Sequence, residues 1–147
     1  MKTLLLSSFL LQGAILFFDE LYFHRKRGLP LWEKFSHPID SFSVLICYLF
    51  LFVSEYNEST LKIFIGLSVL SCLLITKDEF VHKAQAPAAE NWLHALLFIV
   101  HPVPFIAAGL LWAEATEKLS FGLMAVFVLL FMLYQIIYWS FFEKSRS

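Results

Sequence analysis

The sequence predicts an all-α, polytopic membrane protein with five transmembrane helices, in which two helix-pair repeats form a four-helix bundle and one extra helix packs beside it. Composition is the first reason. Of the 147 residues 59% are hydrophobic and 17 are Phe, and the mean hydropathy is +0.72, which is typical of membrane proteins rather than soluble domains. The second reason is a polar motif that occurs twice at the ends of apolar runs. We expect a single transmembrane domain, with repeat one at residues 1–58, repeat two at 59–114 and the fifth helix at 115–147.

The first helix is predicted at Thr3–Phe18, an apolar run that Lys2 precedes. A cleaved signal peptide is the alternative, because such peptides also place a basic residue before an apolar stretch. Two features favour a retained helix. The basic segment Arg25–Arg27 follows like a stop-transfer signal, and the polar motif at the end of this run recurs in the middle of the chain.

The second and third helices are predicted on either side of a polar turn. The second helix runs from about Pro38 to Val53, because proline suits the first turn of a helix. The segment Glu55–Thr60, with the sequence EYNEST, forms the turn. The third helix is then predicted from Leu61 to about Val81.

The fourth helix is predicted from near Pro87 to Trp112. Pro102 and Pro104 should kink or locally open it, because proline removes a backbone donor and clashes with the preceding turn. The segment Ala113–Lys118 is a second polar turn.

The fifth helix is predicted at Leu119–Phe142, the longest apolar run. It ends in Tyr134, Tyr138 and Trp139, which we interpret as aromatic residues at the membrane interface. We expect this helix to pack against the others without supplying a ligand.

Five alternating crossings place both motif-bearing connectors on one side of the membrane and the two polar turns on the other. Basic residues are concentrated on the motif side, whereas the opposite side has only Lys2, Lys62 and Lys118. The positive-inside rule then predicts cytoplasmic connectors, a cytoplasmic C-terminus and an outer N-terminus. The basic residues of the motif side are Arg25, Lys26, Arg27, Lys34, Lys77, Lys83, Lys144 and Arg146.

The repeated motif contains an Asp-Glu pair, a His three to five residues later, a short connector and then Glu-x-aromatic-x-His. Helical residues three or four apart share a face, so each Glu and its His can point in one direction. We predict that both copies meet at one end of the bundle and bind metal. The candidate ligands are Glu20, His24, Glu33, His37, Asp78, Glu79, His82, Glu90 and His94.

Two of the acidic positions need comment. Asp19 is five residues from His24, so on an α-helix it lies off the face of that imidazole and is not a candidate ligand. Asp78 is four residues from His82 and competes with Glu79 for the same role. The choice between Asp78 and Glu79 stays open.

Carboxylates with imidazoles and no thiolate suit iron, manganese or zinc. The ligand set resembles that of di-iron carboxylate bundles, in which two helices each give a Glu and two others each give Glu-x-x-His. This chain has one such Glu-x-x-His, from Glu79 to His82, and its other pairs are one residue longer. The resemblance implies two divalent metal ions, iron being favoured over zinc or manganese. The structural alternative is a network of ion pairs without metal.

Asp40 and His101 are polar positions that the repeat does not share, and we predict them to be catalytic. Asp40 lies three residues after His37, and His101 lies seven residues after His94. Seven residues are two helical turns, so His101 should lie roughly 10 Å deeper on the same face. Ionisable residues at such depth are functional candidates. The alternative for His101 is a buried, neutral imidazole that satisfies a carbonyl freed by the prolines.

The favoured function is a di-iron-type oxidoreductase acting on a membrane lipid or another apolar small molecule. A zinc-dependent lipid hydrolase needs fewer ligands than are present. A metal or proton transporter needs a path across the membrane, along which only His101 lies deep. A binding or sensor role without chemistry is a further alternative. The net charge of −1 gives no reason to expect nucleic acid as a partner, and a homo-oligomer is compatible with the sequence.

Overall fold

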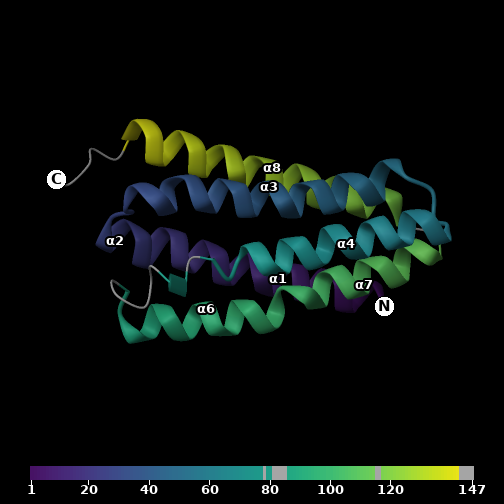
Figure 1. Cartoon of the computed structure of the whole chain (residues 1–147), viewed down its shortest axis with the longest axis horizontal. Coiled ribbons are helices and arrows are strands. Elements are labelled where there is room, and N and C mark those ends of the chain that lie inside the picture. Colours follow the sequence, from purple (N-terminus) through teal and green to yellow (C-terminus); the bar gives the residue numbers. More distant parts are fainter. Residues whose placement is uncertain (78, 81–85, 115–116, 143–147) are drawn as a thin grey trace.

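The computed structural model of the chain describes residues 1–77, 79–80, 86–114 and 117–142, and this described part consists of helices and turns, without strands. Figure 1 shows the long helices lying side by side, with consecutive ones running in opposite directions. The elements are α1 (Lys2–Phe18), η1 (Asp19–His24), α2 (Arg25–Arg27), α3 (Leu31–Val53), α4 (Glu58–Leu74), α6 (Ala88–Val100), α7 (Pro102–Ala113), α8 (Lys118–Ile137) and η2 (Tyr138–Phe142). The predicted all-α class is confirmed.

Four helical stretches in the described part are long and apolar enough to cross a membrane: Lys2–Arg27, Leu31–Val53, Ala88–Ala113 and Lys118–Phe142. The remaining long helix, α4, has 17 residues and therefore spans roughly 26 Å, slightly less than the apolar thickness of a bilayer. The prediction of helices that are able to span a membrane is thus confirmed for four segments. The crossing by α4 and the division into two repeats stay predictions.

Several helix boundaries differ from the predicted ones, and α4 begins at Glu58 rather than at Leu61. Helix α3 begins at Leu31, not at Pro38, because Pro30 adopts the extended conformation of an N-cap and Pro38 is accommodated inside the helix. Pro38 removes one backbone hydrogen bond near the start of α3, where the loss interrupts little of the helix. Helix α4 ends at Leu74 rather than near Val81, and Val81 lies outside the described residues.

The predicted break at the prolines is confirmed. Helix α6 ends at Val100 and α7 begins at Pro102, with His101 in the turn between them. Figure 1 shows the bend where α6 passes into α7. The break places the imidazole of His101 inside the protein, where it is buried.

The surface of the molecule is far more apolar than that of a soluble protein. Its surface carries many large apolar side chains on every long helix, such as Leu10, Phe42 and Leu130. Its interior holds many buried polar groups in addition to apolar ones. A surface of this kind suits a hydrocarbon environment, where polar groups must find their partners inside. The buried polar and charged residues are Ser8, Gln12, Asp19, Glu20, His24, Glu33, Ser36, Ser41, Ser71, Glu90, His94, His101 and Gln135.

The apolar core and the polar cluster occupy different ends of the molecule. The main core contains Leu5 at the start of α1, Trp112 near the end of α7 and Phe121 at the start of α8. These elements meet at the end where the N-terminus lies in Figure 1. The opposite end, where η1, α2 and the start of α6 meet, holds most of the buried charges.

Candidate metal centre

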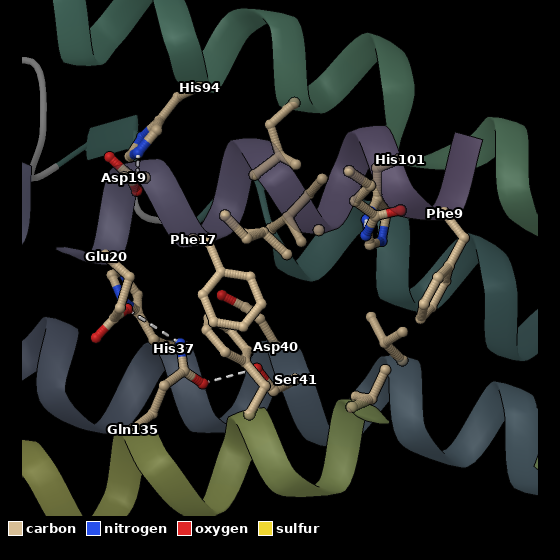
Figure 2. Close-up of a pocket in the computed structure, with 18 of the residues that line it drawn as sticks. Phe9, Phe17, Asp19, Glu20, His37, Asp40, Ser41, His94, His101 and Gln135 are labelled. Atoms are coloured by element: carbon tan, nitrogen blue, oxygen red, sulfur yellow. Dashed lines mark hydrogen bonds and ion pairs between the residues drawn. The ribbon is translucent and has the colours of Figure 1, made fainter. Parts of the chain in front are cut away.

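Four buried side chains form a compact group that could hold a metal ion. Asp19 and His24 come from η1, and Glu90 and His94 come from α6; one ligand atom from each lies within 4.8 Å of all the others. We call these four residues the quartet. Figure 2 shows Asp19 and His94 facing each other across the space between their helices.

Local helix geometry explains how the quartet forms. Glu90 and His94 are four residues apart on α6 and therefore share a face. Asp19 and His24 are five residues apart, but η1 is a π-helical segment, in which residue i bonds to residue i+5. The π-helical geometry returns Asp19 to the face of His24. The expectation that Asp19 lies off that face assumed α-helical periodicity, which does not hold here.

The two histidines of the quartet converge on one oxygen atom of Asp19. The Nε2 atoms of His24 and His94 lie 3.1 Å and 2.8 Å from Oδ2 of Asp19. Asp19 Oδ1 and Glu90 Oε2 are buried and have no hydrogen-bond partner among the described residues. Buried carboxylate oxygens without a partner are costly and rare. Their lone pairs are available to a cation.

A second group, formed by Glu20, His24 and His37, shares His24 with the quartet. The Nδ1 atom of His24 lies 3.5 Å from Glu20 Oε2, and Nδ1 of His37 lies 3.8 Å from the same oxygen. His24 therefore directs one ring nitrogen to each group. Glu20 already accepts hydrogen bonds from two side chains near the end of the chain, Gln135 through Oε2 at 3.3 Å and Trp139 through Oε1.

Arg27 connects the quartet to Glu33. Its guanidinium binds Glu33 through two hydrogen bonds of 3.2 Å and 2.7 Å and donates a third, of 2.7 Å, to Glu90 Oε1. Gly28, with a φ of 77° that favours glycine, turns the chain directly after Arg27 toward α3. Both oxygens of Glu33 thus face a cation already present in the protein. The structure does not bring Glu33 into either metal-competent group of the described residues.

The described residues at this end include four buried carboxylates, whose negative charge needs compensation by cations. Asp19, Glu20, Glu33 and Glu90 are all buried, and Arg27 is the guanidinium that binds two of them. Burying carboxylates without compensating positive charge is unfavourable. Protonated histidines or a metal ion can supply the balance, which is the physical reason to consider a metal at the quartet.

The remaining predicted ligands are not brought into these groups. Glu79 is partly buried and belongs to neither of them. Asp78 and His82 lie outside the described residues. For these three residues the assignment as ligands stays a prediction.

The two predicted catalytic residues line a cavity next to the quartet but are held by other groups. Lys77 Nζ lies 2.5 Å from Asp40 Oδ1. The two ring nitrogens of His101 lie 2.8 Å from the amide nitrogen of Gln12 and 3.1 Å from the hydroxyl of Ser71. Because the Gln12 amide can only donate to Nδ1, His101 carries its proton on Nε2 and donates it to Ser71. The imidazole is therefore satisfied by side chains rather than by a carbonyl freed at the prolines.

The cavity extends from the metal-competent groups to His101 and has a volume of about 100 Å³. Figure 2 shows Asp19, Glu20 and His94 at one end and His101 with Phe9 at the other. Its walls between these ends are mainly apolar and aromatic. They include Phe9, Leu16, Phe17, Val44, Leu97, Phe98, Phe127, Val128 and Phe131.

Several residues of the site were not predicted from the sequence. Trp139, interpreted as an interfacial aromatic, is buried and donates to Glu20, and Gln135 makes α8 a contributor to the site. Gln12 is the partner of His101. The available signal was the position of Gln12 and Gln135 inside apolar runs, because an amide in such a run must find a partner within the protein.

Comparison of the chain with protein-family models, with curated proteins and with solved structures found no match. In its described part the chain is all-helical, has segments able to span a membrane, and contains a buried group of Asp, Glu and His side chains that could hold a metal ion.

Proposed function

We propose that the chain is a membrane-embedded, metal-dependent oxidoreductase that acts on a lipid or another apolar molecule. The observation that supports this proposal most is the quartet, which offers two imidazoles and two carboxylates at the end of an apolar cavity. Two of the carboxylate oxygens have no hydrogen-bond partner among the described residues. Such a ligand set suits iron, manganese or zinc, and iron with open positions serves oxygen chemistry.

The quartet supports one ion directly. Asp19, His24, Glu90 and His94 would hold it, and Glu20 would orient His24 by accepting the proton of its Nδ1, as carboxylates behind metal-bound histidines commonly do. Glu20 is suited to this role because hydrogen bonds from Gln135 and Trp139 hold its carboxylate in place. A second ion, which the sequence predicts, would need ligands beyond the quartet, from Glu20 and His37 or from residues outside the described part.

The carboxylates that line the cavity favour oxidation over hydrolysis. Glu20 is bound by Gln135 and Trp139, and Asp40 is bound by Lys77. Neither is well placed to take a proton from a water molecule, which a hydrolase requires of its general base. No donor among the described residues reaches Asp19 Oδ1, and for this reason a zinc-dependent lipid hydrolase, with Asp19 as base rather than ligand, is the second candidate.

In the proposed reaction a C–H bond of the apolar substrate becomes a C–OH group. Dioxygen is the oxidant; one of its atoms enters the product and the other leaves as water. A reduced electron carrier of the membrane supplies the two electrons, and two protons are taken up. The bound metal would supply the activation of dioxygen. The protein would contribute the ligands, the orientation of His24 by Glu20, and an apolar cavity that limits access of water.

Metal analysis of the purified protein tests this proposal. We expect about one iron per chain by inductively coupled plasma mass spectrometry, and a high-spin nitrosyl EPR signal after reduction and addition of nitric oxide. Glu90→Gln should lower metal affinity by roughly 100-fold or more, because loss of even an outer partner of a ligand typically costs 10- to 100-fold.

Asp40→Asn is the matched control, since Asp40 lines the same cavity but is bound to Lys77 and lies outside both metal-competent groups. It should keep the metal. Zinc as the sole bound metal would support the hydrolase instead. If the folded wild-type protein binds no metal, the proposal is wrong and these residues form an ion-pair network.

A further inference from the structure

Two phenylalanine side chains separate the cavity from the outside of the protein. Phe17 on α1 and Phe127 on α8 both line the cavity, yet 36% and 42% of their surfaces are exposed. Each ring thus contacts the internal space and the external surroundings. This part of the wall is one side chain thick.

The wall between α1 and α8 consists of aromatic contacts rather than closely packed backbones. The centroid of the Phe127 ring lies 5.7 Å from that of Phe9 and 5.9 Å from that of Phe17. The ring centroids of Phe17 and Phe131 are 4.9 Å apart. The backbone of α8 approaches α3 closely along its length but makes few close approaches to α1. We call these four phenylalanines the α1–α8 seam. Side-chain rotation alone can open it, because no backbone packing has to be broken.

Gly13 makes room at the centre of the seam. It lies four residues from both Phe9 and Phe17 and therefore shares their face of α1. A Cβ atom placed on Gly13 would lie 3.9 Å from Phe127 Cε1, an ordinary van der Waals contact. A methyl group would fit at this position, but a longer side chain would fill the gap between the two helices.

The surroundings of the seam are apolar on both sides. Outside, Leu10 on α1 and Leu130 on α8 are more than half exposed. Inside, the path leads past Leu16 and Leu97 toward the quartet. No charged residue belongs to the seam, so a polar molecule crossing it would lose its hydration without compensation.

We propose that the α1–α8 seam is the route by which a hydrocarbon chain of a membrane lipid reaches the cavity directly from the apolar phase of the membrane. The cavity of about 100 Å³ is several times the 10 to 15 Å³ that one water-sized group needs. It therefore accepts a segment of one chain, not a whole lipid. This inference rests on the proposed function only in assigning the quartet as the place where the chain reacts.

Photolabelling with a defined probe tests the route. The protein is reconstituted in phosphatidylcholine nanodiscs that contain palmitic acid with a diazirine near its methyl end, irradiated, and mapped by tandem mass spectrometry. We expect adducts on Val44 and Leu97, which line the cavity and are buried. Ile106, which is 62% exposed, reports labelling from the surrounding lipid.

Gly13→Leu should reduce the adducts on Val44 and Leu97 about tenfold, because the added side chain fills the seam, and should leave labelling of Ile106 unchanged. Gly66→Leu is the matched control, since a Cβ on Gly66 meets nothing within 4 Å, and it should label like wild type. Phe127→Ala should increase the cavity adducts.

Two results would overturn the proposal. Cavity adducts in Gly13→Leu and Phe127→Ala that equal those of wild type would show that chains do not pass the seam. Labelling confined to surface positions in the wild type would show that the cavity does not accept a hydrocarbon chain. Metal content measured on the same samples separates this proposal from the previous one, because labelling needs no metal and metal binding needs no open seam.

Discussion

Two adjacent carboxylates, Asp19 and Glu20, have different surroundings although the sequence presents them as a pair. Among the described residues, no hydrogen-bond partner reaches Asp19 Oδ1, whereas Glu20 accepts hydrogen bonds from Gln135 and Trp139. His24 lies between them, with Nε2 toward Asp19 and Nδ1 toward Glu20. A neutral imidazole can bind a metal with one nitrogen and donate a proton from the other. This division favours Asp19 as the ligand and Glu20 as the residue that positions His24.

Glu20→Gln tests the division at the level of one residue. The amide has one acceptor oxygen in place of two, and its NH₂ group would face the donors that Glu20 now binds. We expect metal affinity to fall roughly 10- to 100-fold, while the number of nitrogen and oxygen ligands measured by X-ray absorption stays the same. Glu90→Gln, in contrast, should change the ligand set. A changed set in Glu20→Gln would make Glu20 a direct ligand.

At the scale of elements, the π-helical segment η1 decides which carboxylate belongs to the quartet. It places Asp19 and His24 on one face although they are five residues apart. Such segments are rare in helices and frequent at functional sites. The arrangement also leaves Leu21 on the outside, where 44% of its surface is exposed.

Deletion of Leu21 should therefore be tolerated. Removing one residue from the π-helical turn leaves Asp19 and His24 four apart, which gives a shared face on an ordinary α-helix. We expect the variant to fold and to retain its metal within about tenfold of wild-type affinity, as measured by metal titration. Deletion of Leu10 is the control, because it rotates one part of α1 by about 100° relative to the other and should abolish folding. Loss of metal from a Leu21 deletion variant that still folds would show that the π-helical geometry itself is required.

The elements themselves could largely be predicted from the sequence, because long apolar runs, polar turns and the Pro102 break are local signals. Glu90 and His94 followed from α-helical periodicity and do meet the first motif copy in the structure. Asp19 could not be predicted, because a departure from α-helical geometry has no clear local signature. The partners of Glu20 could not be predicted either, since Gln135 and Trp139 lie more than a hundred residues away in the chain.

At the scale of the whole molecule, the separation of the apolar core from the buried charges gives the protein two unlike ends. One end holds the buried charges, Arg27 and the exposed basic residues Arg25 and Lys26. Arg25 also lies over the ring of Tyr138, 4.6 Å from its centroid, an arrangement typical of membrane interfaces. We propose that this end faces the cytoplasm, in accordance with the positive-inside rule.

Cysteine accessibility tests this orientation. We expect Lys26→Cys to be protected from a membrane-impermeant maleimide in intact cells and Glu58→Cys to react, because α2 and the start of α4 lie toward opposite ends of the molecule (Figure 1). The cysteine is placed at Glu58 rather than at Asn57, because the side chain of Asn57 caps α4 together with Thr60. Labelling of both variants after cell lysis is the control. If Lys26→Cys reacted in intact cells and Glu58→Cys did not, the protein would have the opposite orientation in the membrane.

The π-helical turn is also the place where the two copies of the motif differ in length. Asp19 and His24 are five residues apart, whereas Asp78 and His82 are four apart. A π-helical turn holds one residue more than an α-helical turn. If both copies descend from one duplicated ancestor, the additional residue of the first copy is an insertion that the helix absorbed within a single turn. The insertion then left the pairing of the Asp19 carboxylate with the His24 imidazole intact. The first copy thus changed in length without changing the types of side chain that it pairs.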